Sequence, residues 1–298
     1  MNGQARPAFA FDAGGKTKHT LLSFGANATR MLLENVKVRE HEGFVGTYRR
    51  LTLAAPRIAP QVRPGQFVHV RLPAPADAIL RRPFSVFKAG DGELQIVYKA
   101  VGRGTLAMRH LEPGDALDLL GPLGHGFPAP APGAFPVLVA GGYGMAALYL
   151  QAAAAPVPGL ALFGGRTAED ILCVPDFTAL GWTVHVATED GSLGTRGRVT
   201  RALDEWLAAE GTKTTPEFFA CGPNPMLRAV GERALAGGWK AWLSIDRHMG
   251  CGVGACLTCV QKIRAPDTPA GWIWARVCRE GPVFECREVV WEELERAD

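Results

Sequence analysis

Three of the seven cysteines in this chain lie close together in RHMGCGVGACLTCVQK, residues 247–262. Their spacing is Cys251-x4-Cys256-x2-Cys259, and Cys278 follows further along the chain. Plant-type [2Fe–2S] sites take three thiolate ligands at this spacing and a fourth from elsewhere in the chain. The glycines at 250, 252 and 254 allow the backbone to turn tightly and to direct its N–H groups toward the sulfurs. The spacing therefore predicts an iron–sulfur site with Cys251, Cys256 and Cys259 as ligands and Cys278 as the candidate for the fourth.

Zinc binding and simple burial are the two alternatives for these cysteines. A zinc site with four cysteine ligands usually pairs two short Cys-to-Cys knuckles, whereas Cys278 stands alone and Cys286 lies eight residues beyond it. Buried thiols with no metal are the second alternative. We expect Cys173, Cys221 and Cys286 not to be cluster ligands.

Two glycine turns could bind a nucleotide. Gly142-Tyr-Gly144-Met-Ala-Ala147 fits G-x-G-x-x-G/A between an apolar strand and a helix, where phosphate binds at a helix N-terminus. No acidic residue ends the next strand, which reads LFGGR, so this is not a standard dinucleotide fingerprint, and close strand–helix packing is the alternative. CGPNPML follows the strand EFFA at the carboxyl end of a second parallel strand, the edge where ligands bind in such sheets.

A third candidate lies earlier in the chain, in RRPFSV (81–86) and VYKAVGRGT (97–105). Arginine, serine and backbone groups on a strand edge, beside a Gly-x-Gly-Thr loop, can hold a pyrophosphate. Taken alone, these residues fit an edge strand with an exposed arginine pair more simply.

The elements that must position these residues fall into four segments. Residues 1–30 are expected to be a flexible extension. Residues 31–132 contain short β-type runs and a hairpin motif, AGDGE, which predict a small antiparallel barrel. After the Pro-rich linker PAPAPG, strands alternate with helices over 133–240, which predicts a parallel α/β sheet. Residues 241–298 form a cysteine-bearing, loop-rich tail. The fold class expected is therefore β plus α/β with a small C-terminal cluster domain.

Composition excludes several function classes. The 298 residues carry a formal net charge of +3 with scattered Lys and Arg, which argues against a nucleic-acid partner. No charged residue stands between Asp118 and Arg166, but glycines and prolines interrupt every stretch that approaches a membrane span. An odd number of cysteines and no secretory signal indicate thiolate chemistry in a reducing, cytoplasmic compartment.

Six motifs occur here in an order that resembles one known family. They are LRRPFSV, VGRGT, AGGYGMAALYL, TEDGSLGTRGRVT, CGPNPML and MGCGVGACLTCVQK…VCREGPVF. From residue 31 onward the chain resembles the electron-transfer subunits of NAD-dependent (class 1B) dihydroorotate dehydrogenases, within the ferredoxin reductase superfamily. Two departures are Ala147, where the superfamily often has proline, and the longer gap before Cys278, which contains APDTPAGWIW. VCREGPVF favours Cys278 over Cys286 as the fourth ligand.

The resemblance implies a role for each matching residue. The flavin and its phosphates would be held by Arg82, Pro83, Phe84 and Ser85, with Val97, Tyr98 and Lys99 beside the isoalloxazine or ribityl chain. Gly104 and Thr105 would bind the FAD pyrophosphate. The nicotinamide dinucleotide would lie over Gly141, Gly142 and Gly144, with Cys221, Gly222 and Pro223 close to the nicotinamide. The cluster ligands would be Cys251, Cys256, Cys259 and Cys278.

The resemblance also implies the activity. FAD, a [2Fe–2S] cluster and NAD would carry electrons to or from a separate FMN-containing catalytic subunit that converts dihydroorotate, in a heterotetramer with two of each subunit. No general acid, base or nucleophile is then required of this chain, and its seven histidines form no obvious catalytic set. A reductase or diaphorase subunit serving another oxidoreductase, and a non-enzymatic zinc-stabilised binding protein, are the alternatives.

Overall fold

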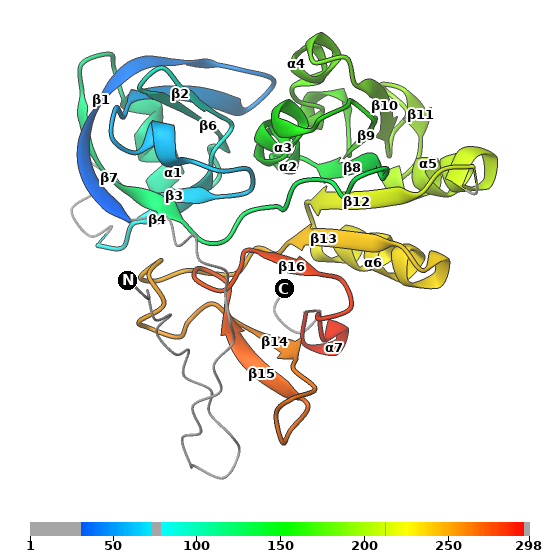
Figure 1. Cartoon of the computed structure of the whole chain (residues 1–298). Helices are drawn as coiled ribbons and strands as arrows, with labels where there is room; N and C mark the ends of the chain where they lie inside the picture. Colours follow the sequence, from blue (N-terminus) through cyan, green and yellow to red (C-terminus); the bar gives the residue numbers. More distant parts are fainter. Residues whose placement is uncertain (1–30, 73–78, 212, 295–298) are drawn as a thin grey trace.

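The computed structural model describes residues 31–72, 79–211 and 213–294. The expected extension, residues 1–30, lies outside the described residues. Figure 1 shows three packed parts: a curled antiparallel sheet, an α/β part, and a smaller part built by the C-terminal residues. This arrangement confirms the expected fold class.

The first part is an antiparallel sheet of seven strands that curls on itself in the order β4-β3-β7-β1-β2-β6-β5. Its strands are β1 (Leu32–Gly43), β2 (Tyr48–Ala54), β3 (Phe67–Arg71), β4 (Arg82–Ser85), β5 (Lys88–Gly90), β6 (Glu93–Lys99) and β7 (Ala116–Leu123). Its short helices are η1 (Ala59–Gln61), α1 (Arg103–Ala107) and η2 (Met108–His110). The hairpin expected at AGDGE joins β5 to β6, because Asp91 and Gly92 adopt φ of 50° and 78°.

The second part is a seven-stranded sheet in the order β11-β10-β9-β8-β12-β13-β16, parallel except for β16. Its strands are β8 (Phe135–Gly141), β9 (Leu160–Gly165), β10 (Thr183–Thr188), β11 (Thr195–Arg196), β12 (Pro216–Cys221), β13 (Lys240–Ser244) and β16 (Val283–Glu285). Its helices are α2 (Gly144–Ala147), α3 (Tyr149–Ala154), η3 (Ala168–Asp170), α4 (Val174–Ala179), α5 (Val199–Trp206), η4 (Leu207–Gly211) and α6 (Asn224–Gly237).

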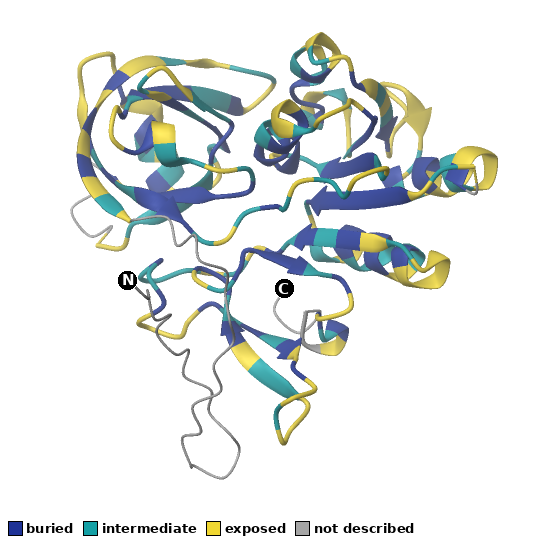
Figure 2. Cartoon of the chain, viewed as in Figure 1, coloured by how far each residue is buried: buried dark blue, intermediate teal, exposed yellow. Residues whose placement is uncertain are grey.

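Burial explains the absence of charged residues between Asp118 and Arg166. Residues 137–140 of β8 are completely buried, as the middle strand of a sheet covered on both faces must be (Figure 2). In the described part of the chain, no helix is long and apolar enough to cross a membrane.

The C-terminal part carries the cysteine loop and a two-stranded hairpin, and ends in a short helix. These elements are β14 (Val260–Arg264), β15 (Trp272–Arg276) and α7 (Trp291–Leu294). The insertion APDTPAGWIW forms the turn of this hairpin and the start of β15. Because β16 pairs with β13, the tail is joined to the α/β sheet.

One apolar core connects the three parts. It contains Phe67 and Leu123 from the curled sheet, many side chains of the α/β sheet, and Cys259 and Cys278 from the tail. A second link is made by His125, whose N–H and Nδ1 donate to the carbonyl oxygens of Gly281 and Arg279, each at 2.6 Å. The relative positions of the three parts are therefore set by packing as well as by the chain.

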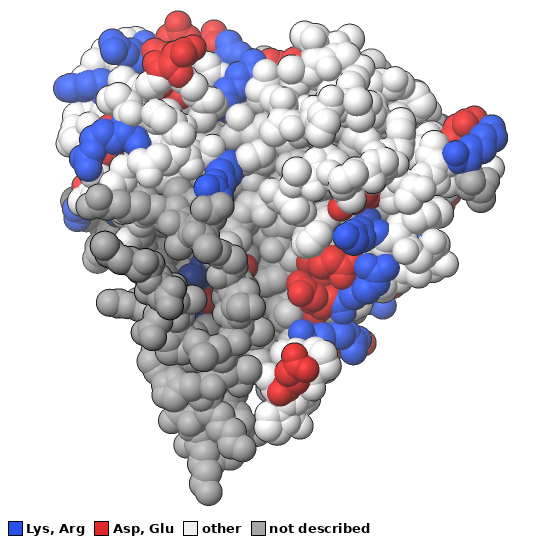
Figure 3. Space-filling model, viewed as in Figure 1, with Lys and Arg blue, Asp and Glu red and all other residues white. Residues whose placement is uncertain are grey.

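The surface charges are mixed. On the face drawn in Figure 3, Lys and Arg side chains alternate with Asp and Glu, and the described residues present no broad basic patch there. This distribution agrees with the low net charge of the whole chain.

Candidate cofactor cleft and cluster site

A large cleft opens where the three parts of the molecule meet. Its volume is about 1450 Å³, above the range of about 300–1,000 Å³ that suits one small ligand. Its lining residues come from all three parts. The curled sheet contributes Tyr48, Leu80, Arg82, Pro83 and Lys99. The α/β part contributes its glycine turns, Arg166, Asp170, Glu189 and the starts of α5 and α6, and the tail contributes 246–250, Thr258, Val260, Gln261 and Trp274. The cleft therefore connects both nucleotide-type regions with the cysteine loop.

The two glycine turns lie side by side in this cleft, at the carboxyl ends of the paired strands β8 and β12. Gly141, Gly142, Gly222 and Pro223 line it. Gly144 instead serves close packing, because a Cβ there would lie 2.1 Å from the carbonyl oxygen of Cys221. The glycines of this turn therefore have two roles. Gly141 and Gly142 leave an open surface in the cleft, whereas Gly144 allows close contact with the backbone of Cys221.

Cys221 is buried beneath these turns and does not line the cleft. Burial raises the pKa of its thiol to about 12, so the side chain is a neutral thiol at physiological pH. The backbone of this residue, which contacts Gly144, is what shapes the neighbouring turn.

Only part of the predicted flavin set faces the cleft. Arg82, Pro83 and Lys99 line it, whereas Val97 and Tyr98 are buried in the curled sheet. The Tyr98 hydroxyl is hydrogen-bonded to His41 Nε2 at 2.9 Å. Strand alternation separates Tyr98 from Lys99, since neighbours on β6 point to opposite faces of the sheet. Val97 shares the face of Lys99 but is buried in the cluster that contains Tyr48, Phe87 and side chains of the α/β part.

The other predicted flavin residues do not line the cleft. Phe84 and Ser85 are half-buried, and the Phe84 ring packs edge-on against Tyr98 with 6.1 Å between centroids. Thr105 Oγ1 accepts the backbone N–H groups of Val101 and Gly102 at 3.0 and 3.1 Å, which caps α1. At Gly104, a Cβ would meet Leu72 Cδ1 at 2.5 Å.

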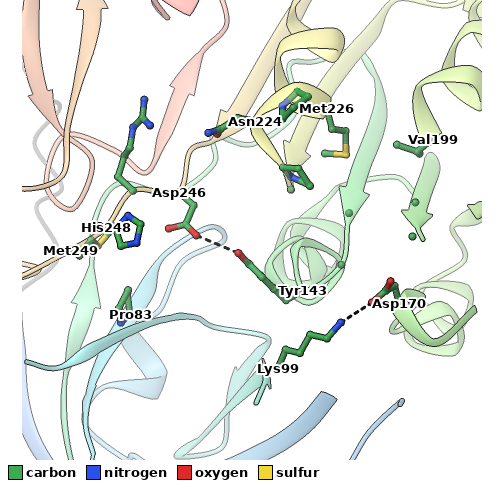
Figure 4. A pocket seen from close by; sticks show the side chains of 18 of the residues that line it. Pro83, Lys99, Tyr143, Asp170, Val199, Asn224, Met226, Asp246, His248 and Met249 are labelled. Atoms are coloured by element: carbon green, nitrogen blue, oxygen red, sulfur yellow. Dashed lines mark hydrogen bonds and ion pairs between the residues drawn. The ribbon is translucent and has the colours of Figure 1, made fainter. Parts of the chain in front are cut away.

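Lys99 connects the two halves of the cleft. Its ammonium lies 3.1 Å from Asp170 Oδ1 and 4.8 Å from the centroid of the Tyr48 ring (Figure 4). The Tyr48 hydroxyl donates to the same carboxylate oxygen at 3.2 Å. Burial by itself would raise the pKa of Asp170, but the hydrogen bonds from Lys99 and Tyr48 outweigh it and hold the pKa below its usual value.

We expect Asp170→Asn to destabilise the protein at pH 7 and to have less effect in acid. Because the pKa of Asp170 is lower in the folded protein, its contribution is complete above the unfolded pKa of about 3.9 and is lost as the pH falls through the folded pKa. The loss at pH 7 should be about 1 kcal/mol or less, since the pair is partly exposed. Denaturant unfolding at pH 7 and pH 3 measures it, with Glu205→Gln, from an exposed helix pair, as the control. A difference that grows in acid would contradict this assignment.

Tyr143 and Asp246 form a second polar contact across the cleft, far apart in the sequence. The Tyr143 hydroxyl donates to Asp246 Oδ2 at 3.3 Å, and His248 and Met249 lie beside them (Figure 4). Burial raises the pKa of Asp246, although the Tyr143 hydrogen bond opposes the rise. Sequence reasoning missed both residues, because single polar side chains outside a motif carry no signal; only the position of Tyr143 inside GGYG pointed to this region.

The predicted cluster ligands come together as two pairs. Cys251 and Cys256 are adjacent, and the Cys251 sulfur accepts backbone N–H groups from Ala255 at 3.2 Å and Cys256 at 3.4 Å. In the second pair, the N–H of Cys278 donates to the Cys259 sulfur at 3.4 Å. The expected use of the glycines is confirmed at Gly252 and Gly254, which adopt φ of 70° and 81° and turn the loop around the Cys251 sulfur.

The donor set of the two pairs, four thiols, is the one that a [2Fe–2S] cluster takes. Hydrogen bonds from Thr258 lower the pKa of Cys256 to about 6, and contact with the Cys278 thiol lowers that of Cys259 to about 7. Neighbouring thiolates repel one another, so ionising all of them requires the positive charge of a metal centre.

Arg276 holds the fourth cysteine beside the loop. Its guanidinium forms an ion pair with Glu280, and Nη1 donates to the carbonyl oxygen of Gly254 at 3.0 Å. The pair is nearly buried, so the turn that carries Cys278 is firmly placed against the cysteine loop. Cys286 lies elsewhere: its Cβ is 3.4 Å from the position a Cβ would take at Gly231 on α6, and burial raises the pKa of its thiol to about 12.

Comparison with known proteins decides the family. The electron transfer subunit of dihydroorotate dehydrogenase B (NAD(+)) from Bacillus caldolyticus is 41% identical over 251 residues, covering 80% of this chain and 91% of that protein. The chain belongs to the family of dihydroorotate dehydrogenase B electron transfer subunits. The subunit from Geobacillus thermodenitrificans is 40% identical over 248 residues, with the same coverage. The resemblance noted from the sequence motifs is confirmed.

Two further matches agree with membership among the dihydroorotate dehydrogenase B electron transfer subunits. The family described as the iron-sulfur cluster binding domain of dihydroorotate dehydrogenase B matches residues 246–290, which include all four paired cysteines. Among solved structures, an NADH-dependent reduced ferredoxin-NADP oxidoreductase superposes with a TM-score of 0.75 at 26% identity, covering 92% of this chain and 94% of that one. The architecture of the reductases is thus present over nearly the whole chain.

Proposed function

We propose that this chain passes electrons between NAD and an FMN-containing dihydroorotate dehydrogenase catalytic subunit, using FAD and a [2Fe–2S] cluster. The observation that carries the proposal is the single cleft that joins the glycine turns, the Arg82–Lys99 wall and the cysteine loop. Electron carriers bound along one cleft are close enough to exchange electrons without a diffusing intermediate. The name of the relatives, which includes NAD(+), supports NAD over NADP.

The chain's own residues would bind, orient and shield the carriers. The chemistry that bound FAD supplies is two-electron exchange with nicotinamide and one-electron exchange with the cluster. Arg82 would place positive charge beside the FAD phosphates, and Phe84, Ser85, Val97, Tyr98, Gly104 and Thr105 would shape that wall. Gly141, Gly142 and Gly222 would let the dinucleotide approach the backbone, with Gly144, Cys221 and Pro223 fixing the two turns.

The cysteine loop would form the outlet of the electron path. Cys256 and Leu257 are exposed, whereas Cys259 and Cys278 are buried against the core. The pairs Cys251–Cys256 and Cys259–Cys278 would each hold one iron, with the exposed pair nearer the partner. We propose a heterotetramer with two copies of each subunit and a cytoplasmic location, which suits a chain whose thiols must stay reduced.

Purified protein tests the proposal in two steps. Alone, it should show flavin absorbance, give an EPR signal on one-electron reduction, and oxidise NADH with artificial acceptors, but not turn over dihydroorotate. Co-expression with a class 1 dihydroorotate dehydrogenase catalytic subunit should yield a complex that couples orotate formation to NAD reduction. Stoichiometric zinc without flavin would contradict the electron-transfer role.

A reductase for a different acceptor is the second candidate, favoured by the likeness to the NADH-dependent reduced ferredoxin-NADP oxidoreductase. The two functions share the carriers and differ in the partner. Failure to form the complex, together with co-purification of another oxidoreductase, would support this candidate and reject the first.

A further inference from the structure

His69 occupies an unusual position in the curled sheet. It lies on β3 between Val68 and Val70, which point into the core of that sheet. His69 and Phe67 therefore point to the opposite face, where Phe67 joins the core that contains Cys259 and Cys278. The histidine side chain is completely buried, with an exposed fraction of 0%.

Neither ring nitrogen of His69 has a hydrogen-bond partner among the described residues. Burial, together with the charges of Arg81 and Arg82, lowers the pKa of His69 to about 4, so the ring is neutral and keeps one N–H. Leaving a buried donor unpaired costs about 1–3 kcal/mol. Such a donor in a native fold calls for an acceptor that the polypeptide itself does not supply.

The cysteine loop lies directly against the imidazole. A Cβ at Gly252 would be 2.6 to 2.8 Å from Cε1, Nδ1 and Nε2 of His69, so only glycine lets the loop approach this closely. Gly252 immediately follows the cluster ligand Cys251. On its other side, His69 is paired across the ladder with Pro83, which lines the cleft. His69 therefore stands in the wall between the flavin-type strand and the cluster loop.

We propose that the N–H of His69 donates a hydrogen bond to a sulfur of the bound [2Fe–2S] cluster, and that this bond raises the reduction potential of the cluster. The inference rests on the proposed function, because it requires the cluster. Sulfur atoms carrying negative charge accept such bonds, and hydrogen bonds to them are among the factors that set cluster potentials. Reduction adds negative charge, so a donor stabilises the reduced form. His69 acts here as a positioning and tuning residue.

The midpoint potential of the cluster in the whole chain, followed by EPR during a redox titration, tests the proposal. His69→Phe keeps a buried ring and removes the donor, so reduction should become about tenfold less favourable, a shift of about 59 mV to lower potential. His69→Gln, which retains an N–H, should recover part of the shift. Phe67→Leu, a packing change on the same face of β3, should leave the potential unchanged. An unshifted potential in His69→Phe, or an equal shift in Phe67→Leu, overturns the proposal.

A second measurement uses the wild-type protein, so it does not depend on whether a variant folds. Pulsed EPR of the reduced wild-type protein with ¹⁵N-labelled histidine should detect a weak nitrogen coupling to the cluster, and absence of this coupling overturns the proposal. If the wild type shows no [2Fe–2S] EPR signal, the cluster assignment falls together with this inference. A normal cluster signal without nitrogen coupling overturns only the role of His69.

Discussion

Cys278→Ser should abolish the [2Fe–2S] cluster, whereas Cys286→Ser should leave it intact. Cys278 donates its backbone N–H to the Cys259 sulfur at 3.4 Å and is placed by the Arg276–Glu280 ion pair. Loss of even a supporting contact typically lowers metal affinity about 10–100-fold, so loss of a direct ligand should reduce cluster occupancy by at least that much. Iron analysis and the EPR signal of the reduced protein measure the occupancy.

Flavin content and NADH oxidation with artificial acceptors provide the internal control for Cys278→Ser. Both depend on the cleft residues contributed by the curled sheet and the glycine turns, so they should persist, while electron transfer to the catalytic subunit is lost. Cys286 is equally buried, so its replacement tests for a general packing effect. If Cys286→Ser loses the cluster and Cys278→Ser keeps it, the fourth ligand has been assigned to the wrong residue.

Gly144→Ala should weaken nicotinamide binding. The added methyl group would lie 2.1 Å from the carbonyl oxygen and 2.6 Å from the carbonyl carbon of Cys221, so the two glycine turns must move apart. Overpacking of this kind costs about 1–3 kcal/mol in stability. We expect NADH to bind at least about tenfold more weakly, a loss of about 1.4 kcal/mol, with the flavin spectrum retained.

NADH titration of the flavin spectrum and a thermal unfolding curve measure the two effects of Gly144→Ala. Gly43→Ala is the matched control, because a Cβ at Gly43 meets no atom within 4 Å and the residue does not need a left-handed backbone. Equal NADH affinity in wild type and Gly144→Ala would show that the contact between the two turns does not shape the nicotinamide site.

The features that depend on neighbouring residues could be predicted from the sequence. The Asp91–Gly92 hairpin, the glycine turns after β8 and β12 and the cysteine loop all follow from local backbone requirements, which a short motif expresses completely. The order of such motifs was also sufficient to indicate the family. Local spacing did not decide between Cys278 and Cys286, because no motif determines the conformation of the chain between the cysteine loop and the fourth cysteine.

The side chains that meet across the three parts could not be predicted from the sequence and follow from the packing of the folded chain. Lys99 reaches Asp170, Tyr143 reaches Asp246, and His69 contacts Gly252, although each pair is far apart in the sequence. Strand alternation further separated Lys99, in the cleft, from Tyr98, in the core. These contacts depend on how the curled sheet, the α/β sheet and the tail pack around one shared core, and that packing arises from many weak apolar contacts rather than from any single motif.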